Sequence, residues 1–473
     1  MILNNHRRFF LIGIGGAGMS AIALILKGMG AEVEGSDLKE SRYTALLAAE
    51  KIKVFLGHDK KNIKNADAVV YSTAIADDNE ELVHARKKNI PVYTRGEILS
   101  WILNSRKGIA VTGTHGKTTT TSMISLMLKG LDLDPIIIIG GELNELGSNA
   151  RYGDGDYIVA EACESDGTFL KYRPFAGVIT NVEDDHLDYW KDFEKLKQSF
   201  FEFIGNIKPG GFAVIGGDEQ IFTGGAAKGL ISCKKIITFG LDPDNTVSAG
   251  DIKLSNFSSS FTLAVKDEGP SIAAGIEQKP AVKKFSMKLN VPGVYNIKNS
   301  LAALAVAHGL GLDTGKAAKI LEFFTGAKRR FEKRGEKNGA LIFDDYAHHP
   351  TEVRATLEAA VSEKKRGRII TVFQPHRYSR LLNLHEKFSK SFEGSDILVV
   401  SDIFGSDERP IPGVTGKLLI DSIVDSGFKN RLVYIPRISD IKDFLIGNIR
   451  EGDIVLVMGA GDITRVTEDI LKN

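Results

Sequence analysis

Short β-branched runs that end in glycine or aspartate, each followed by an amphipathic helical stretch, constrain the fold of this chain more than any other feature. Strands of this kind are predicted at 9–12, 68–71, 109–111, 157–159, 177–180, 369–373, 397–400, 432–435 and 454–458. Near-continuous apolar strands that alternate with helices indicate parallel sheets covered on both faces. Residues 257–265 and 285–291 instead alternate apolar and polar positions, so half-exposed antiparallel strands are predicted there.

The strand series restarts near residues 105 and 325, and 473 residues are too many for one hydrophobic core. We therefore predict an α/β protein of three domains, each built on a mostly parallel sheet. A Rossmann-like domain is expected over 1–105, a P-loop ATPase-like domain with some antiparallel strands over 106–325, and a second Rossmann-like domain over 326–473.

The charge balance and the cysteine count exclude several classes of protein. Lys and Arg total 61 against 60 Asp and Glu, which lacks the basic excess of a dedicated nucleic-acid binder. The longest aliphatic run, 136–139, is far shorter than the ~20 apolar residues of a membrane span. With two cysteines, a disulfide framework is not expected. We predict a cytoplasmic enzyme that neither binds nucleic acid nor inserts into a membrane.

A glycine loop follows the first predicted strand and opens a helix. The loop runs from Gly13 to Ser20, and Asp37 ends the next predicted strand. Glycines allow close backbone approach to a pyrophosphate at a helix N-terminus, and an acid at this distance can meet a ribose hydroxyl. Three alternatives remain open: NAD, another diphosphate nucleotide, or a merely structural turn.

A second phosphate loop follows the strand at 109–111, with the sequence TGTHGKTTT over 112–120. The full P-loop pattern has glycine five residues before the Gly-Lys pair, where this chain has Val111, so the motif is a shortened variant. Backbone N–H groups cradle phosphates, Lys117 reaches the β and γ oxygens, and the Thr118 hydroxyl can ligate Mg²⁺. The loop predicts an ATP site. Because a nicotinamide site and an ATP site on one chain would be an unusual combination, this second site favours a nucleotide-tagged substrate over NAD as the ligand of the first loop.

Acidic residues follow two strands predicted to end beside the P-loop. The sequence EACESD lies at 161–166 and NVEDDH at 181–186. Mg²⁺ favours carboxylate oxygens, which makes Glu164 the first candidate ligand and His186 a second. The alternative is that these acids cap the following helices, which suits Asp184 and Asp185 best. Cys163 is expected to be a small buried apolar residue.

The last third of the chain gathers histidines and arginines just beyond predicted strand ends. DDYAHHP lies at 344–350 and QPHRYSR at 374–380. No HExxH or CxxC spacing supports zinc. Arg377 and Arg380 suit a clamp for a carboxylate or phosphate, because guanidinium groups bind such anions bidentately. A solvated surface face is the alternative for these two arginines.

Taken together, these motifs resemble the Mur ligase family of peptidoglycan synthesis. The resemblance covers essentially the whole chain in order, from GIGGAGMS and GSD through TGTHGKTTT, EACESD, TNVEDDHLDYW, GVYNIKNS, KRRFE, DDYAHHPTE and QPHRYSR to MGAGD. It implies that the first domain binds a UDP moiety, the second ATP, and the third an incoming amino acid. The implied substrates are UDP-N-acetylmuramate, L-alanine and ATP with Mg²⁺. The implied reaction makes an amide through an acyl phosphate, in a monomer or weak homodimer.

The resemblance assigns site residues position by position. The implied UDP-substrate set is Gly15, Gly16, Ala17, Gly18, Met19, Ser20, Asp37 and Ser72. The ATP set is Gly113, Thr114, His115, Gly116, Lys117, Thr118, Thr119, Asn296, Asn299, Arg330 and Asp345. Tyr346, His348, His376, Arg377 and Arg380 would surround the amino acid and the muramoyl carboxylate. Thr118, Glu164 and His186 would serve the metal, and Lys117, His186, Arg330 and His348 would act in catalysis.

Two positions depart from the family pattern. The family's usual EADESD reads EACESD here, so Cys163 replaces an aspartate, and we expect altered support of the metal rather than its loss. Tyr295 stands where family members often have histidine, beside the expected adenine pocket.

Overall fold

The computed structural model describes residues 6–472 except 144–146, 224–232, 234, 268–270, 274–275, 279–280, 365 and 407. The chain forms two compact units. The first comprises 1–251, 261–287 and 298–324, and the second comprises 252–260, 288–297 and 325–473. Three main sheets are present, and the α/β class predicted from the strand pattern is confirmed. The three-domain boundaries stay a prediction.

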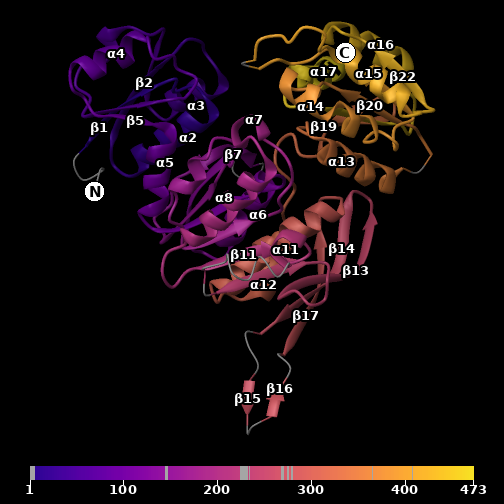
Figure 1. Cartoon of the computed structure of the whole chain (residues 1–473), viewed down its shortest axis with the longest axis horizontal. Coiled ribbons are helices and arrows are strands. Elements are labelled where there is room, and N and C mark those ends of the chain that lie inside the picture. Colours follow the sequence, from indigo (N-terminus) through magenta and orange to yellow (C-terminus); the bar gives the residue numbers. More distant parts are fainter. Residues whose placement is uncertain are drawn as a thin grey trace. The chain divides into compact units, whose positions relative to one another are not determined.

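The N-terminal sheet, drawn in indigo in Figure 1, has five parallel strands in the order β3-β2-β1-β4-β5. The strands are β1 (Arg8–Ile12), β2 (Glu32–Asp37), β3 (Lys53–Leu56), β4 (Ala68–Tyr71) and β5 (Val92–Thr94). The connecting helices are α2 (Ala17–Gly28), α3 (Arg42–Ala49), η1 (Lys60–Asn62), α4 (Glu80–Lys87) and α5 (Arg95–Asn104). Successive side chains of β1 enter two different cores, Phe9 and Leu11 on one face and Phe10 and Ile12 on the other. Both faces are therefore covered, as the apolar runs predict.

The central sheet has ten strands in the order β17-β14-β13-β12-β11-β10-β6-β9-β7-β8. They are β6 (Lys107–Thr112), β7 (Ile136–Leu143), β8 (Ser148–Arg151), β9 (Tyr157–Glu161), β10 (Ala176–Ile179), β11 (Phe212–Gly216), β12 (Ile236–Gly240), β13 (Val247–Ser255), β14 (Ser258–Lys266) and β17 (Val282–Leu289). A separate antiparallel pair is formed by β15 (Ser271–Ala273) and β16 (Ile276–Gln278). The helices are α6 (Lys117–Gly130), η2 (Thr168–Lys171), α7 (Leu187–Trp190), α8 (Phe193–Gly205), α9 (Gln220–Thr223), α11 (Val294–Gly309) and α12 (Thr314–Leu321).

The central sheet is parallel around the P-loop and changes character towards its ends. Strand β6 pairs in parallel with both β9 and β10, whereas β7 and β8 are antiparallel. Strands β13 and β14 are neighbours joined by only two residues, a connection that requires an antiparallel hairpin. Burial alternates along β14, which confirms the half-exposed strand predicted at 257–265.

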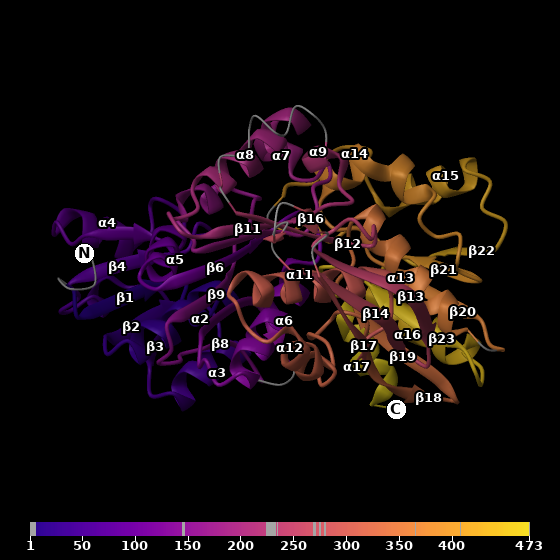
Figure 2. The same ribbon diagram turned by 90° about the horizontal axis from the view of Figure 1, so that it is seen from below.

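The C-terminal sheet has six strands in the order β18-β19-β23-β20-β21-β22, all parallel except the β18–β19 pair (Figure 2). They are β18 (Glu332–Lys337), β19 (Ala340–Asp345), β20 (Ile369–Phe373), β21 (Ile397–Val400), β22 (Arg431–Tyr434) and β23 (Ile454–Met458). Helices α13 (Pro350–Glu363), α14 (Tyr378–Ser389) and α15 (Gly416–Asp425) pack on one face. Helices α16 (Ile438–Asn448) and α17 (Arg465–Leu471) pack on the other, and η3 (Asp462–Thr464) precedes α17.

Among the residues that the structure describes, no helix combines the length and the apolar character that crossing a bilayer demands.

Candidate functional site

The first glycine loop lies at the carboxyl end of β1 and is supported by Asp37 at the end of β2. The Gly15 N–H donates to Asp37 Oδ2 at 2.8 Å. A Cβ atom on Gly15 would lie 2.9 Å from that oxygen and 2.8 Å from Thr44 Cγ2, so the position has no room for a side chain. Asp37, which is predicted to meet a ribose hydroxyl, therefore uses one carboxylate oxygen to support the loop.

The other residues of the predicted UDP set lie on the same loop and on the first turn of α2. The N-cap of α2 is Gly16, and the Ser20 hydroxyl donates to Ala17 O at 3.0 Å. The first N–H groups of a helix lack intrahelical acceptors, so this turn offers donors to an anion. Met19 is 1% exposed and packs in the core, which leaves only its backbone for a ligand. Ser72 lies beside the loop, 3.3 Å from a Cβ built on Gly13.

Two residues that sequence reasoning missed also lie against this loop. Arg95, the first residue of α5, places Nη1 2.8 Å from a Cβ built on Gly18. Asn149 on β8 is 1% exposed and donates from Nδ2 to Ala17 O at 2.6 Å. Both residues lie far along the chain from the loop, and no motif marks them. The packing of α5 and β8 against α2 within the first unit brings them there.

The P-loop is built around an ion pair between Lys117, which is partly buried, and the buried Glu164. Lys117 Nζ donates to Gly113 O at 2.6 Å, to Thr114 O at 3.0 Å and to Glu164 Oε1 at 3.0 Å. Burial is the largest single effect and lowers the pKa of Lys117, but the charge of Glu164, its hydrogen bond and smaller effects of nearby groups together raise the pKa to about 12. The loop thus carries a permanent positive charge at the start of α6.

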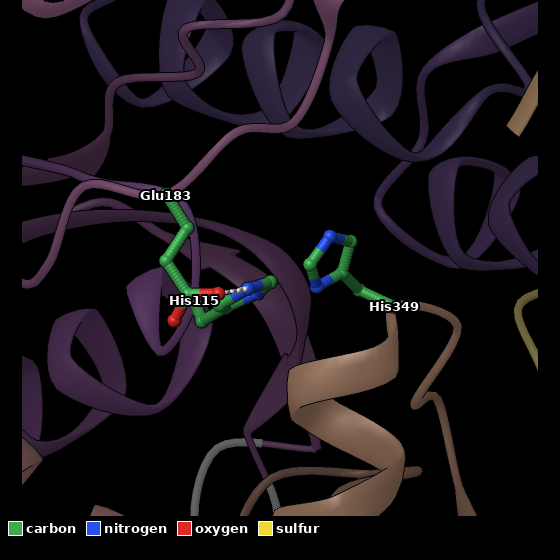
Figure 3. A group of neighbouring side chains, drawn as sticks. All are labelled: His115, Glu183 and His349. Atoms are coloured by element: carbon green, nitrogen blue, oxygen red, sulfur yellow. Dashed lines mark ion pairs between the residues drawn. The ribbon is translucent and has the colours of Figure 1, made fainter. Parts of the chain in front are cut away.

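Strand β10 forms the wall of the P-loop, as its position beside β6 requires. A Cβ on Gly113, whose φ is +125°, would lie 2.9 Å from Asn181 O. The His115 N–H donates to Asn181 Oδ1 at 2.9 Å, and the Thr180 hydroxyl donates to His115 O at 2.5 Å. His115 also lies beside Glu183, with Nε2 and Oε2 3.6 Å apart (Figure 3). The loop is therefore fixed by its neighbour strand before any ligand binds.

The candidate metal ligands gather at the same edge. Glu164 is 1% exposed, and its Oε2 atom is buried without a hydrogen-bond partner in the described part of the chain. His186 Nε2 lies 3.7 Å from Glu164 Oε1. Thr118 is the second residue of α6, directly after Lys117. A buried carboxylate oxygen with unused lone pairs suits a hard cation, so these residues fit Mg²⁺.

Cys163, at the position where the sequence resemblance implies an aspartate, is a neutral group beside this site. Its Sγ atom lies 3.1 Å from Ser165 Oγ. Burial raises the pKa of the thiol, and the nearby charge of Glu164 raises it further. The position therefore lacks the negative charge that an aspartate would add next to Glu164.

Helix α11 carries the two asparagines expected near adenine. Asn299 Oδ1 accepts a hydrogen bond from the Thr120 hydroxyl at 3.2 Å, and the same atom lies against Gly116, whose φ is +80°. Asn296 donates from Nδ2 to Pro292 O at 2.7 Å. Asn299 thus lies directly against the P-loop.

The second unit places a buried carboxylate at the carboxyl end of β19. Asp345 accepts hydrogen bonds from the N–H groups of Phe331 at 2.6 Å and Ala347 at 2.7 Å. Burial raises the pKa of Asp345 to about 6, and the charge of Arg330 limits the rise. Tyr295 is partly buried here, and the loss of solvation together with the charge of Asp345 raises the pKa of its hydroxyl.

Two arginines and an aromatic ring lie near this carboxylate. The guanidinium carbons of Arg329 and Arg330 lie 5.0 Å and 5.2 Å from the centre of the Tyr346 ring. Cation–π contacts of this kind order the arginines. Of these, Arg330 and Tyr346 are predicted site residues.

The histidines and arginines predicted to hold the amino acid do lie together in the second unit. The His348 and His376 ring centres are 5.8 Å apart, and Arg380 Nη1 lies 3.2 Å from His376 Nδ1. Arg377 directly precedes α14 and has a φ of +67°. Burial, followed by the charges of His348, Arg380 and Arg377, lowers the pKa of His376 to about 3. His376 is therefore a neutral imidazole among cations.

Comparison with known proteins agrees with this arrangement. Three family models match in order: the Mur ligase family, catalytic domain at 9–107, the Mur ligase middle domain at 111–307, and the Mur ligase, glutamate ligase domain at 329–461. A protein of Pelotomaculum thermopropionicum named UDP-N-acetylmuramate--L-alanine ligase is 42% identical over 99% of this chain and 98% of its own length. The chain belongs to the Mur ligase family.

Further relatives of this Mur ligase support the same assignment. The protein of the same name from Carboxydothermus hydrogenoformans is 44% identical over 97% of this chain and 95% of its own. The crystal structure of UDP-N-acetylmuramate-alanine ligase from Thermotoga maritima matches with a TM-score of 0.79 at 28% identity, over 98% of both chains. A murein peptide ligase from Psychrobacter arcticus, 22% identical over 98% of both chains, has the same fold with a TM-score of 0.70.

Proposed function

We propose that this Mur ligase uses ATP to join L-alanine to the lactyl carboxylate of UDP-N-acetylmuramate, a step of peptidoglycan precursor synthesis. The observation that carries the proposal is the ion pair of Lys117 with the buried Glu164, inside a P-loop of a chain whose full-length relatives carry this activity in their names. A carboxylate is inert towards amines at neutral pH, so an activating group is required. ATP can supply this group, and the cation of the P-loop is suited to hold its phosphates.

The first step is transfer of the γ-phosphoryl group. A carboxylate oxygen of the substrate attacks the γ-phosphorus, the bond to the β-phosphate oxygen breaks, and ADP leaves. Phosphoryl transfer depends on positioning and charge neutralisation. We assign the phosphates to Gly113–Thr119, the neutralising charges to Lys117 and Arg330, the adenine to Asn296 and Asn299, and the ribose to Asp345.

Glu164, Thr118 and His186 would hold Mg²⁺, which when bound neutralises negative charge on the phosphates. The buried Oε2 atom of Glu164, which has no hydrogen-bond partner among the described residues, supports this assignment. In the chain itself, Glu164 also fixes Lys117, so one carboxylate sets the place of the amine that meets the phosphates.

The first glycine loop would bind the UDP handle without taking part in chemistry. The free N–H groups of the first turn of α2 and the guanidinium of Arg95 suit a pyrophosphate. Asn149 would tie the loop to the central sheet through Ala17. The predicted set from Gly15 to Ser20, with Asp37 and Ser72, forms the rest of this site.

The second step is aminolysis of the acyl phosphate. The L-alanine amine attacks the acyl carbon, the tetrahedral intermediate collapses, and phosphate leaves as the amide forms. Arg377 and Arg380 are suited to the carboxylate of L-alanine, with Tyr346 and the neutral His376 beside them. We propose His186 or His348 as the acceptor of the amine proton.

A phosphate-release assay tests the proposal. With UDP-N-acetylmuramate, ATP and Mg²⁺ present, release should depend on L-alanine far more than on the other nineteen amino acids. The product should be the alanyl conjugate by mass. Release that depends on a tripeptide instead would assign a sister ligase, and absorbance change near 340 nm without phosphate release would assign an oxidoreductase. Either result would overturn the proposal.

A further inference from the structure

The two candidate metal ligands outside the P-loop lie on segments without regular structure of their own. Glu164 follows β9 in a turn that continues to Gly167, and His186 lies between β10 and α7. His186 has a φ of +56°, a left-handed conformation that a residue with a Cβ seldom adopts. Such a conformation persists only where surrounding contacts hold it.

One side chain contacts both segments. The indole Nε1–H of Trp190 donates to the main-chain carbonyl of Glu164 at 2.9 Å. The backbone N–H of the same residue donates to His186 O at 3.1 Å, as does the N–H of Tyr189. Trp190 therefore ties the backbone of one candidate ligand to the backbone of the other.

The turn that carries Glu164 also packs tightly against α7. The Trp190 ring meets the fully buried Phe169 ring edge to face, with centres 6.3 Å apart. A Cβ on Gly167, whose φ is +68°, would lie 2.6 Å from Tyr189 Oη. Because α7 has only four residues, these contacts rather than helical propensity hold it in place.

We propose that Trp190 is a positioning residue that sets the spacing of the two metal ligands, Glu164 and His186, through the indole hydrogen bond to Glu164 O. The inference rests on the proposed function, because it takes these two residues as ligands of Mg²⁺. Residues that do not contact the metal but hydrogen-bond to its ligands orient those ligands, and their removal weakens metal binding by roughly 10- to 100-fold. Since Glu164 Oε1 also binds Lys117, a shift of this turn moves the P-loop amine as well.

The decisive comparison removes the hydrogen-bond donor and keeps the ring. Trp190→Phe should weaken Mn²⁺ binding in the presence of ADP, measured as free Mn²⁺ by electron paramagnetic resonance, by about 10-fold. It should raise the Mg²⁺ concentration at half-maximal phosphate release by a similar factor and leave the KM for L-alanine unchanged. Trp101→Phe, the other tryptophan of the chain, is the matched control and should change neither quantity.

A second variant removes the donor with less change of shape. In the Trp101→Phe background, 3-benzothienylalanine at position 190 replaces the indole N–H by sulfur and keeps the two-ring outline. It should reproduce the weaker Mn²⁺ binding even if Trp190→Phe fails to fold. Unchanged Mn²⁺ affinity in the benzothienyl variant would overturn the inference.

Glu164→Gln separates this inference from the proposed function. If Glu164→Gln weakens Mn²⁺ binding while the donor-free variants do not, the metal site stands and the role of Trp190 is wrong. If Glu164→Gln leaves Mn²⁺ binding intact, the metal assignment itself is wrong, and the inference falls with it.

Discussion

The two glycine loops of the first unit follow the same order of strand, loop and helix, but side chains of opposite charge support them. Both follow a buried parallel strand, and both open a helix. The loop at 13–20 is closed by a carboxylate, Asp37, that accepts a backbone N–H. The loop at 112–120 is closed by an amine, Lys117, that donates to two backbone carbonyls and to Glu164.

This difference shows how one backbone motif can serve binding in one place and chemistry in another. In the P-loop the cation is partly buried and paired with a buried carboxylate, so a fixed positive charge lies where the charge of the phosphates would change during the reaction. In the first loop the nearby cation is Arg95, which comes from another helix and lies at the α2 N-terminus. We infer that the first loop grips an anion whereas the second also stabilises a transition state.

Removal of the P-loop cation should have the largest effect. Lys117→Met should lower kcat for alanine-dependent phosphate release by about 10³-fold, because a charge on the transferring group is lost. It also leaves Glu164 buried without its partner, which should cost about 3–5 kcal/mol of stability. The measurements are steady-state phosphate release and urea unfolding.

The double variant Lys117→Met with Glu164→Gln is the control for folding. It should recover stability, because no unpaired charge remains, and should still be inactive. Near-normal turnover in the single variant would show that the two loops do not differ in the way described.

Removal of the cation beside the first loop should affect binding and not chemistry. Arg95→Ala should raise the KM for UDP-N-acetylmuramate by about 10- to 100-fold, as expected for a charged hydrogen bond, with little change in kcat. Arg86→Ala is the matched control, since Arg86 pairs with the exposed Asp77 on the same domain and should leave KM unchanged. A fall in kcat with constant KM would instead place Arg95 in the chemistry.

A methyl group added to the first loop should test how closely Asp37 and Thr44 pack against Gly15. Gly15→Ala forces a Cβ against Asp37 and Thr44 and should cost about 1–3 kcal/mol of unfolding free energy. Gly16→Ala, the next residue, meets nothing closer than 3.5 Å and has a φ of −74°, so it should cost less than about 0.5 kcal/mol. Equal losses in the two variants would contradict the account of Asp37 as the support of this loop.

A pH series should show a change in stability that comes from a residue outside both loops. The pKa of Lys117, about 12, keeps the P-loop charged at any physiological pH. Asp345, whose pKa burial raises to about 6, holds its proton more tightly in the folded state. Its stabilising protonation is complete below pH 3.8 and is lost as pH rises through 6, by roughly 1 kcal/mol per pH unit. The stability difference between wild type and Asp345→Asn should therefore change between pH 4 and 6.5, and parallel curves would contradict the buried, protonated state.

Much of this molecule could be predicted from local sequence. Buried strands such as 109–111 and 454–458 are recognisable because a strand covered on both faces must be apolar throughout. The P-loop is recognisable because cradling phosphates restricts residue types at adjacent positions, from Gly113 to Thr118. The grouping of His348, His376 and Arg380 follows from parallel strands, which end at one edge of a sheet.

The remaining features depend on packing between distant segments. Arg95 and Asn149 reach the first loop only because α5 and β8 pack around α2, and Trp190 meets Glu164 across 26 residues of chain. The same holds for Asp37, one of whose oxygens binds Gly15, and for the pKa of His376, which depends on burial among cations. Sequence by itself determined the strands, the two loops and the family, because these follow from residue types at short spacing. Tertiary structure alone decided which side chains support each loop, because hydrogen bonds, burial and charge act through space and not along the chain.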